Sequence, residues 1–224
     1  SVYDTIEEPL ARVLFEMERN GVRIDVSVLR DFADSLRKRM NECESRVREL
    51  AGNPTLNVAS PKQLGELLFE QLKIEPKMKR TNKGSWPTDE ETLSALSDRN
   101  PVIEDILDYR GTRKLLSTYI EPLPGYISER DGRVHTTFNQ ALTATGRLSS
   151  SNPNLQNIPI RTEEGQQIRR AFVAPEGCVV MSADYSQIEL RIMAHFCGDV
   201  HMLQAFRDGE DVHKSMAAKI FSTS

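Results

Sequence analysis

The stretch VVMSADYSQIELR (residues 179–191) indicates the fold class of this chain. A short apolar run, Val179–Met181, is followed by Asp184 and then by a pattern with helical spacing. An apolar run of this length between polar residues is typical of a buried strand. Ser186 and Glu189 have the S-x-x-E spacing of a capping box, which marks the start of a helix. We therefore expect a strand that leads directly into a helix, with Asp184 at the carboxyl end of the strand.

Two interpretations of these carboxylates stay open at this point. Asp184 could hold a hard divalent cation, because such ions prefer oxygen ligands, or it could cap a turn. Glu189 has a structural explanation of comparable weight, since the capping box stabilises a helix by about 1 kcal/mol. The residues of this stretch alone favour the structural role for Glu189 and do not decide the role of Asp184.

Composition places the chain among ordinary globular proteins. It has 224 residues, of which 38% are hydrophobic and 28% charged, which is enough for one large domain or two small ones. No apolar run approaches the roughly 20 residues of a membrane-spanning helix. The opening SVYDTIEEPL lacks the basic and apolar regions of a secretion signal. The three cysteines are widely spaced, which predicts reduced thiols in a cytoplasmic protein and no zinc site or disulfide framework: Cys43, Cys178 and Cys197.

Charge is unevenly distributed along the chain. The formal net charge is −4, but residues 109–173 contain nine Lys or Arg against five Asp or Glu, so this segment is +4 and the remainder −8. Residues 73–83 contain five basic residues and one acidic residue. Such runs are usually solvated surface, and they become informative only together with other signals.

The chain is expected to be helical first and mixed later. The expected helices of the first half are residues 10–17, 28–50, 61–72, 89–96 and 102–119. Asn20-Gly21 marks a helix end, and Ser60 is expected to cap the helix that opens with Pro61. Strand-like runs then occur at residues 133–140, 168–174 and 178–184, with a hairpin turn at Asp131-Gly132, and helices return at 187–196, 201–208 and 211–221. We expect an α+β fold with a domain boundary near residue 120.

Two further stretches have residue types suited to nucleic acid. The segment TATGRLSSSNPNLQNIPI (residues 143–160) is rich in hydroxyl and amide side chains, which bond to phosphates and to base edges. The minor groove presents nearly the same acceptor atoms for every correct base pair. Side chains that bond there therefore recognise the geometry of the base pair more than its sequence. The segment YRGTRKLLSTYI (residues 109–120) places Arg110, Arg113, Lys114 and Ser117 along one helical face, a spacing that can follow a phosphate backbone. Taken singly, each stretch is more often an ordinary surface loop or an exposed basic helix.

The order of these stretches is specific. YRGTRKLLSTYI, then TATGRLSSSNPNLQNIPIR, then DYSQIELR closely resembles the polymerase domain of bacterial DNA polymerase I, the family A DNA polymerases. The opening EEPLARVLFEMERNGVRID (residues 7–25) is also similar to the entry into that domain. The resemblance covers essentially the whole chain.

The resemblance implies a fold and a reaction. The fold is a mostly helical thumb over residues 1–120 and part of an antiparallel-sheet palm over residues 121–224, ending before the fingers. The reaction is template-directed addition of deoxynucleotides to a primer 3′-hydroxyl with two Mg²⁺ ions, so the implied partners are primer–template DNA and dNTPs, with no membrane. The implied location is cytoplasmic and nucleoid-associated.

The resemblance also implies roles for individual residues. Asp184 would be one of the two aspartates that bind the catalytic Mg²⁺ ions, with the backbone carbonyl of Tyr185 as a further ligand. Glu189 would be a steric gate against a 2′-hydroxyl, and Gln187 and His213 would lie at the incoming nucleotide. The implied DNA-binding residues are Arg110, Lys114, Ser117, Thr118, Arg147, Ser149, Ser150, Asn154, Gln156 and Asn157.

The chain departs from the family pattern in two respects. Leu116 stands where members commonly have a lysine, which predicts a weaker grip on phosphate. The fingers motif and the second metal-binding aspartate do not occur in residues 1–224. Because two-metal transfer needs both carboxylate sets, we expect this chain alone to bind duplex DNA without catalysing extension.

Three further possibilities follow from the same residues. One alternative is a non-catalytic DNA-binding module on the same scaffold. Another is a metal-dependent phosphohydrolase that uses Asp184 with Asp199 or Asp211. An exposed sheet edge of the palm could also recruit a second copy, giving a homodimer.

Overall fold

The computed structural model describes residues 1–212, 214 and 217. The chain forms two compact units, Ser1–Cys178 and Val179–Ser224. Within the described residues, no helix combines the length and the apolar character needed to cross a membrane.

The first unit begins with a π-helical turn, η1 (Tyr3–Glu7), that continues as α1 (Glu8–Asn20). Gly21 ends the helix, as predicted, with φ 58° and an N–H that donates to the Met17 carbonyl at 3.0 Å. A side chain at Gly21 would place a Cβ 2.7 Å from the carbonyl oxygen of Val134. Glycine is therefore required at position 21 for two reasons, the left-handed backbone and the close approach of the Val134 backbone.

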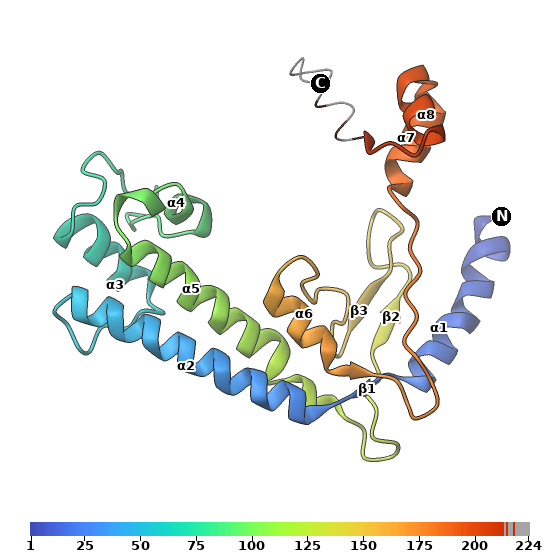
Figure 1. Ribbon diagram of the computed structural model, residues 1–224, viewed down its shortest axis with the longest axis horizontal. Helices are drawn as coiled ribbons and strands as arrows, with labels where there is room; N and C mark the ends of the chain where they lie inside the picture. The colour runs from blue at the N-terminus through green and yellow to red at the C-terminus, as the bar shows by residue number, and fades with distance from the viewer. Residues whose placement is uncertain (213, 215–216, 218–224) are drawn as a thin grey trace. The chain divides into compact units, whose positions relative to one another are not determined.

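Two long helices, α2 (Val26–Leu50) and α5 (Val102–Leu115), lie side by side (Figure 1). Asp25 caps α2 by accepting hydrogen bonds from the amides of Ser27 and Val28, at 2.9 and 3.4 Å. Leu29, Leu36, Cys43 and Val47 of this helix are buried, while Leu50 at its end is 44% exposed. Because α2 contributes to two hydrophobic cores, it connects the two ends of the unit.

The first core lies between α2, α5 and a group of short segments. These segments are α3 (Pro61–Gly65), the π-helical turn η2 (Glu66–Gln71), α4 (Glu90–Ser94) and the 3₁₀ turn η3 (Ser97–Arg99). Ser60 caps α3, as predicted, by accepting from the Gln63 amide, and Asp89 caps α4 by accepting from the Thr92 amide. Val47, Leu68 and Ile106 are fully buried here.

The second core lies where the helices meet the two small sheets. The strand β1 (Arg23–Ile24) pairs antiparallel with β4 (Phe172–Val173), and β2 (Thr137–Asn139) pairs antiparallel with β3 (Ser149–Ser151). The segments η4 (Leu116–Ile120), η5 (Leu123–Tyr126) and α6 (Glu163–Arg170) cover this core. The predicted turn at Asp131-Gly132 is present, since the Ser128 amide donates to the Arg133 carbonyl at 2.8 Å and Gly132 has φ 70°.

The second unit contains two described helices, α7 (Ile188–Cys197) and α8 (Val200–Arg207), which pack together. The guanidinium of Arg191 lies over the ring of Phe206, 4.5 Å from its centroid. The Arg191 Nε also donates to the carbonyl of Ser186 at 2.8 Å. These contacts hold the start of α7 against α8.

The predicted strand at Val179–Met181 is wrong. These side chains are 72–89% exposed, and no strand is assigned to them. A strand needs a neighbour for its backbone N–H and C=O groups, and this segment has none within the described residues. An apolar run predicts burial, but it does not supply the partner strand.

The predicted capping box is also wrong. The residue at the N-cap of α7 is Gln187, one position after Ser186, and it has a left-handed backbone with φ 52° and no side-chain cap hydrogen bond. Because the helix starts at Ile188, Ser186 lies outside the cap position from which its hydroxyl would reach the first amides.

The predicted α+β fold class is confirmed, with helices and small antiparallel sheets. The observed strands are shorter than the predicted ones, and residues 168–170 belong to α6 and not to a strand. The β3 strand lies in a segment interpreted from sequence as a loop. The division near residue 120 stays a prediction.

Candidate nucleic-acid interface

The end of the long helix α5 and the turn η4 present one polar face. Lys114, Ser117 and Thr118 are exposed on it, while Leu116 and Ile120 are buried in the second core. The burial of Leu116 in the second core gives a physical reason for an apolar residue at this position. Lys114, Ser117 and Thr118 therefore share one exposed face, and their contact with phosphate stays a prediction.

Arg110 lies in α5, one turn before Lys114, and its side chain is hydrogen-bonded to the protein. Its side chain is partly buried, and its guanidinium donates to the carbonyl of Thr88 and to the Thr88 hydroxyl. Burial lowers the pKa of Arg110, with an opposing effect from Asp89. Arg110 thus fastens α5 to the segment before α4, and its predicted phosphate contact has to compete with these bonds.

The polar loop that follows β3 is fixed by an internal hydroxyl pair. The Thr136 and Ser150 hydroxyls are 2.6 Å apart, and both are within hydrogen-bond distance of the Pro153 carbonyl. The Ser150 oxygen also accepts from the Leu155 amide at 3.1 Å. Because Ser150 is 4% exposed, it shapes the loop from inside. The Ser149 hydroxyl oxygen is also buried and has no hydrogen-bond partner among the described residues.

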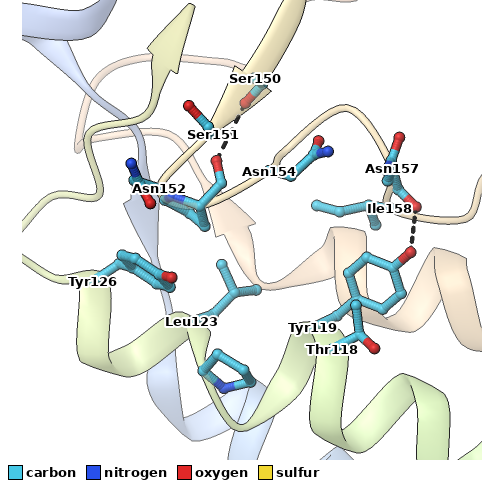
Figure 2. Close-up of a pocket in the computed structure, with 12 residues that line it drawn as sticks. Thr118, Tyr119, Leu123, Tyr126, Ser150, Ser151, Asn152, Asn154, Asn157 and Ile158 are labelled. Atoms are coloured by element: carbon cyan, nitrogen blue, oxygen red, sulfur yellow. Dashed lines mark hydrogen bonds between the residues drawn. The ribbon is translucent and has the colours of Figure 1, made fainter.

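The loop and the helical face meet at a pocket of about 470 Å³. Figure 2 shows Thr118 and Tyr119 from η4 on one side and Asn154 and Asn157 from the loop on the other. The Tyr119 hydroxyl donates to the Asn157 carbonyl at 2.7 Å, which joins the two segments. Two stretches predicted separately from the sequence are therefore brought together on one surface.

The amide side chains of this loop remain available to a partner. Asn154, Gln156 and Asn157 are exposed. The Asn154 side-chain oxygen accepts from the Gln156 amide at 3.0 Å, and its N–H₂ group takes no part in that bond. Such groups can bond to sugars, phosphates and minor-groove base edges.

Arg147 lies on an exposed turn that precedes β3. Gly146 has φ 76°, and the Thr143 hydroxyl donates to the Arg147 carbonyl at 2.6 Å. These two features explain the T-x-T-G-R pattern as a turn that positions the arginine backbone.

Asn152, Tyr119 and Tyr126 are among the pocket residues that sequence reasoning missed. Tyr119 directly follows the polar face and Asn152 lies within the polar segment, so both could have been suspected. Tyr126 is 41% exposed and gave no local signal, because its place depends on how η5 packs.

In the second unit, the predicted nucleotide-side residues lie at the start of α7. Asp184, Tyr185 and Glu189 are exposed, and Gln187 is partly buried at the N-cap. His213 lies outside the described residues.

The described residues do not form a complete metal site. They contain no group of three or more His, Cys, Asp or Glu side chains that could hold a metal ion. Asp184 and the Tyr185 carbonyl are oxygen donors of the type that Mg²⁺ prefers, but the set is too small to hold the ion. Asp199, a ligand in the phosphohydrolase alternative, caps α8 by accepting from the Met202 amide at 2.8 Å, and Asp211 accepts from the Lys214 amide at 3.3 Å.

Comparison with known proteins identifies the family. The sequence profile described as DNA polymerase family A matches residues 26–224. The chain belongs to DNA polymerase family A. This family A chain is 49% identical over 220 residues to "DNA polymerase I, thermostable" of Thermus filiformis and 45% identical over 223 residues to "DNA polymerase I" of Chloroflexus aurantiacus. Both alignments cover 98% of the chain.

A solved structure has the same fold as this family A chain. It is the POL domain of Pol1 from M. smegmatis in complex with DNA primer-template and dNTP, with a TM-score of 0.88 and 40% sequence identity. The match covers 100% of the chain and 39% of that structure, and the chain spans 26% and 24% of the two curated relatives. The family A chain described here thus corresponds to about a quarter of such proteins.

Proposed function

We propose that this chain is the thumb and the first part of the palm of a template-directed DNA polymerase, divided near residue 120. The reaction of the whole protein is the addition of deoxynucleotides to a primer 3′-hydroxyl. The match to family A over residues 26–224 carries this proposal. The likeness to a polymerase domain solved with primer-template DNA and dNTP supports DNA and dNTPs as partners.

In this proposal the surface made by η4 and the polar loop holds the duplex. Lys114 neutralises a backbone phosphate, and Ser117 and Thr118 donate to neighbouring phosphate oxygens. Asn154, Gln156 and Asn157, with Arg147, contact the sugar edges and the minor groove, while the buried hydroxyl of Ser149 acts from within the loop. Ser150 acts from within the loop, and Arg110 acts by fixing the helix that carries Lys114. The shared pocket of Thr118, Asn154 and Asn157 supports this assignment.

The residues at the start of α7 act on the nucleotide side. We assign Glu189 the role of a steric gate, since a carboxylate beside the sugar leaves no space for a 2′-hydroxyl. Gln187 and His213 contact the incoming nucleotide, and Asp184 with the Tyr185 carbonyl supplies part of a Mg²⁺ ligand set. Because this partial set does not hold the ion by itself, we propose that the chain alone binds DNA without extending a primer.

The same proposal covers location and assembly. The protein works in the cytoplasm of a bacterium, at the nucleoid. A second copy can associate through an exposed sheet edge of the palm. Light scattering is expected to reveal dimers as concentration rises, and a monomer at the highest attainable concentration would contradict the homodimer.

Fluorescence anisotropy of labelled DNA tests the DNA-binding function. Primer–template junction, blunt duplex and single strand are titrated with the chain across a salt series. We expect the duplex-containing ligands to bind more tightly than single strand, with an affinity that falls steeply with salt. Arg147→Ala is expected to weaken duplex binding. Equal or absent binding of all three ligands by the folded chain would contradict the proposal.

A further inference from the structure

A basic loop connects η2 to α4 and is not part of the interface described above. Residues 77–85 contain Lys77, Lys79, Arg80 and Lys83 and no acidic residue. The three lysines are exposed, and none forms an ion pair within the described part of the chain. Arg80 differs from them, since its guanidinium is bonded to the protein.

The end of this loop is anchored by Trp86, the one tryptophan of the sequence. Its ring packs on Phe69, with centroids 5.2 Å apart and planes inclined by 32°. Its indole N–H donates to Glu70 Oε1 at 2.8 Å. A Cβ at Gly65 would lie 2.6 Å from the Trp86 Cβ, so glycine makes the room for the ring. Trp86 is thus seated by α3 and η2 together.

Arg80 connects the anchored tryptophan to the loop. Its guanidinium lies over the Trp86 ring, 4.6 Å from the centroid, and Nη2 donates to the same Glu70 Oε1 at 2.6 Å. Its Nη1 donates to the carbonyl of Gly84 at 2.8 Å. The turn closes on itself through bonds between Thr81 and Ser85. The shape of the loop therefore depends on a clasp of three residues, Trp86, Arg80 and Glu70.

We propose that Trp86 is a positioning residue for nucleic-acid binding. Acting through Arg80, it fixes the loop so that Lys77, Lys79 and Lys83 form a ready-made surface for backbone phosphates. A loop that is already ordered avoids the entropic cost of ordering on binding. Its charge complements phosphate, and no acidic residue within the loop competes. This inference rests on the proposed DNA binding and adds the residue that organises the basic loop.

The experiment measures duplex affinity against salt for the chain and for Trp86→Ala. Each phosphate contact contributes about 0.9 to the slope of log affinity against log salt. If the loop loses its shape, we expect the slope of Trp86→Ala to fall by between about 1 and 3, and affinity at about 0.1 M salt to fall about tenfold or more. Trp86→Phe keeps a ring on Phe69 and under Arg80, and is expected to recover most of the lost slope.

Two controls separate positioning from general loss of stability. Leu96→Ala removes a side chain that is 8% exposed in the same core and is not one of the three clasp residues, so it is expected to lower stability and keep the slope. Limited digestion with trypsin, which cuts after lysine and arginine, is expected to cut residues 77–83 faster in Trp86→Ala than in Leu96→Ala.

A chain that binds duplex with the same slope in Trp86→Ala overturns this inference and leaves the proposed function standing. A slope that falls equally in Leu96→Ala overturns it as well, because the effect then reflects stability. A wild-type chain that does not bind duplex overturns both proposals.

Discussion

The hydroxyl of Tyr119 donates a hydrogen bond to the backbone carbonyl of Asn157, 2.7 Å away. This bond joins η4, which carries the polar face of Lys114 and Thr118, to the loop that carries the exposed amides. Because the two segments are 38 residues apart in sequence, their register on a common surface depends on contacts of this kind.

Tyr119→Phe removes this bond and keeps the ring. A neutral hydrogen bond contributes about 1 kcal/mol, so we expect a stability loss of about 0.5–1.5 kcal/mol in chemical denaturation. Duplex affinity is expected to fall a few-fold, because the amide loop is held less firmly. Tyr3→Phe is the matched control, since Tyr3 lies outside the pocket and its hydroxyl makes no hydrogen bond within the described residues. If the two variants lose equal affinity, the Tyr119–Asn157 bond does not organise the surface.

Gly165→Ala tests the packing of α6 against the polar loop. A Cβ at Gly165 would collide with the backbone of Pro159, lying 2.7 Å from its carbonyl carbon. Because neither backbone segment can move without disturbing its own packing, we expect the free energy of unfolding to fall by about 1–3 kcal/mol, measured by urea denaturation. Gly111→Ala in α5 has open space around the new methyl group and is expected to stabilise by about 1 kcal/mol. A stable Gly165→Ala would contradict the close approach.

Local chemistry in the sequence predicted the features that depend on neighbouring residues. The Gly21 helix end, the Ser60 cap and the Asp131-Gly132 turn each require only a few residues in a row, and all three are confirmed. The α+β class is confirmed for the same reason, since helical periodicity is local.

Features that depend on distant partners could not be predicted in this way. Nothing near Ser150 in sequence reveals that Thr136 meets it, and nothing near Arg110 reveals the bond to Thr88. The expected strand at Val179–Met181 failed because pairing needs another strand, and the capping box failed because Gln187 takes the cap position. The predicted DNA and nucleotide roles remain predictions.

His135 makes stability depend on pH. Its Nδ1 lies 2.6 Å from the Glu18 carbonyl and its Nε2 lies 3.1 Å from the Asp131 carboxylate. The bond to Glu18, and then the bond to Asp131, raises the pKa of His135 above 6.5. The contribution of His135 is therefore present below 6.5 and lost as pH rises through its folded pKa.

The contribution of Asp131 to stability depends on pH in the opposite sense. The hydrogen bond with His135 lowers the pKa of Asp131 from 3.8 to about 2, so its contribution is present above 3.8 and lost as pH falls toward about 2. We expect the melting temperature to fall as pH rises above about 6.5, and His135→Gln to lack this part of the fall. An identical pH profile for the variant would contradict this.

The three thiols are expected to differ in reactivity. Cys43 is fully buried, and burial with the Asp108 hydrogen bond raises its pKa to about 11, while Cys178 and Cys197 are exposed. Because the thiolate is the reactive form, a disulfide reagent at neutral pH should titrate Cys178 and Cys197 quickly and Cys43 only after denaturation. Rapid reaction of Cys43 in the folded chain would contradict its buried place between α2 and α5.

Salt-dependent duplex binding by Lys114→Gln tests the central claim, that the face ending in Thr118 follows a phosphate backbone. The matched control is Lys38→Gln, which removes an exposed lysine of α2 outside the proposed surface. We predict that Lys114→Gln weakens binding of every duplex sequence alike and lowers the salt slope by about 1, while the control keeps the wild-type slope. Equal slopes for Lys114→Gln and the wild-type chain would contradict the account.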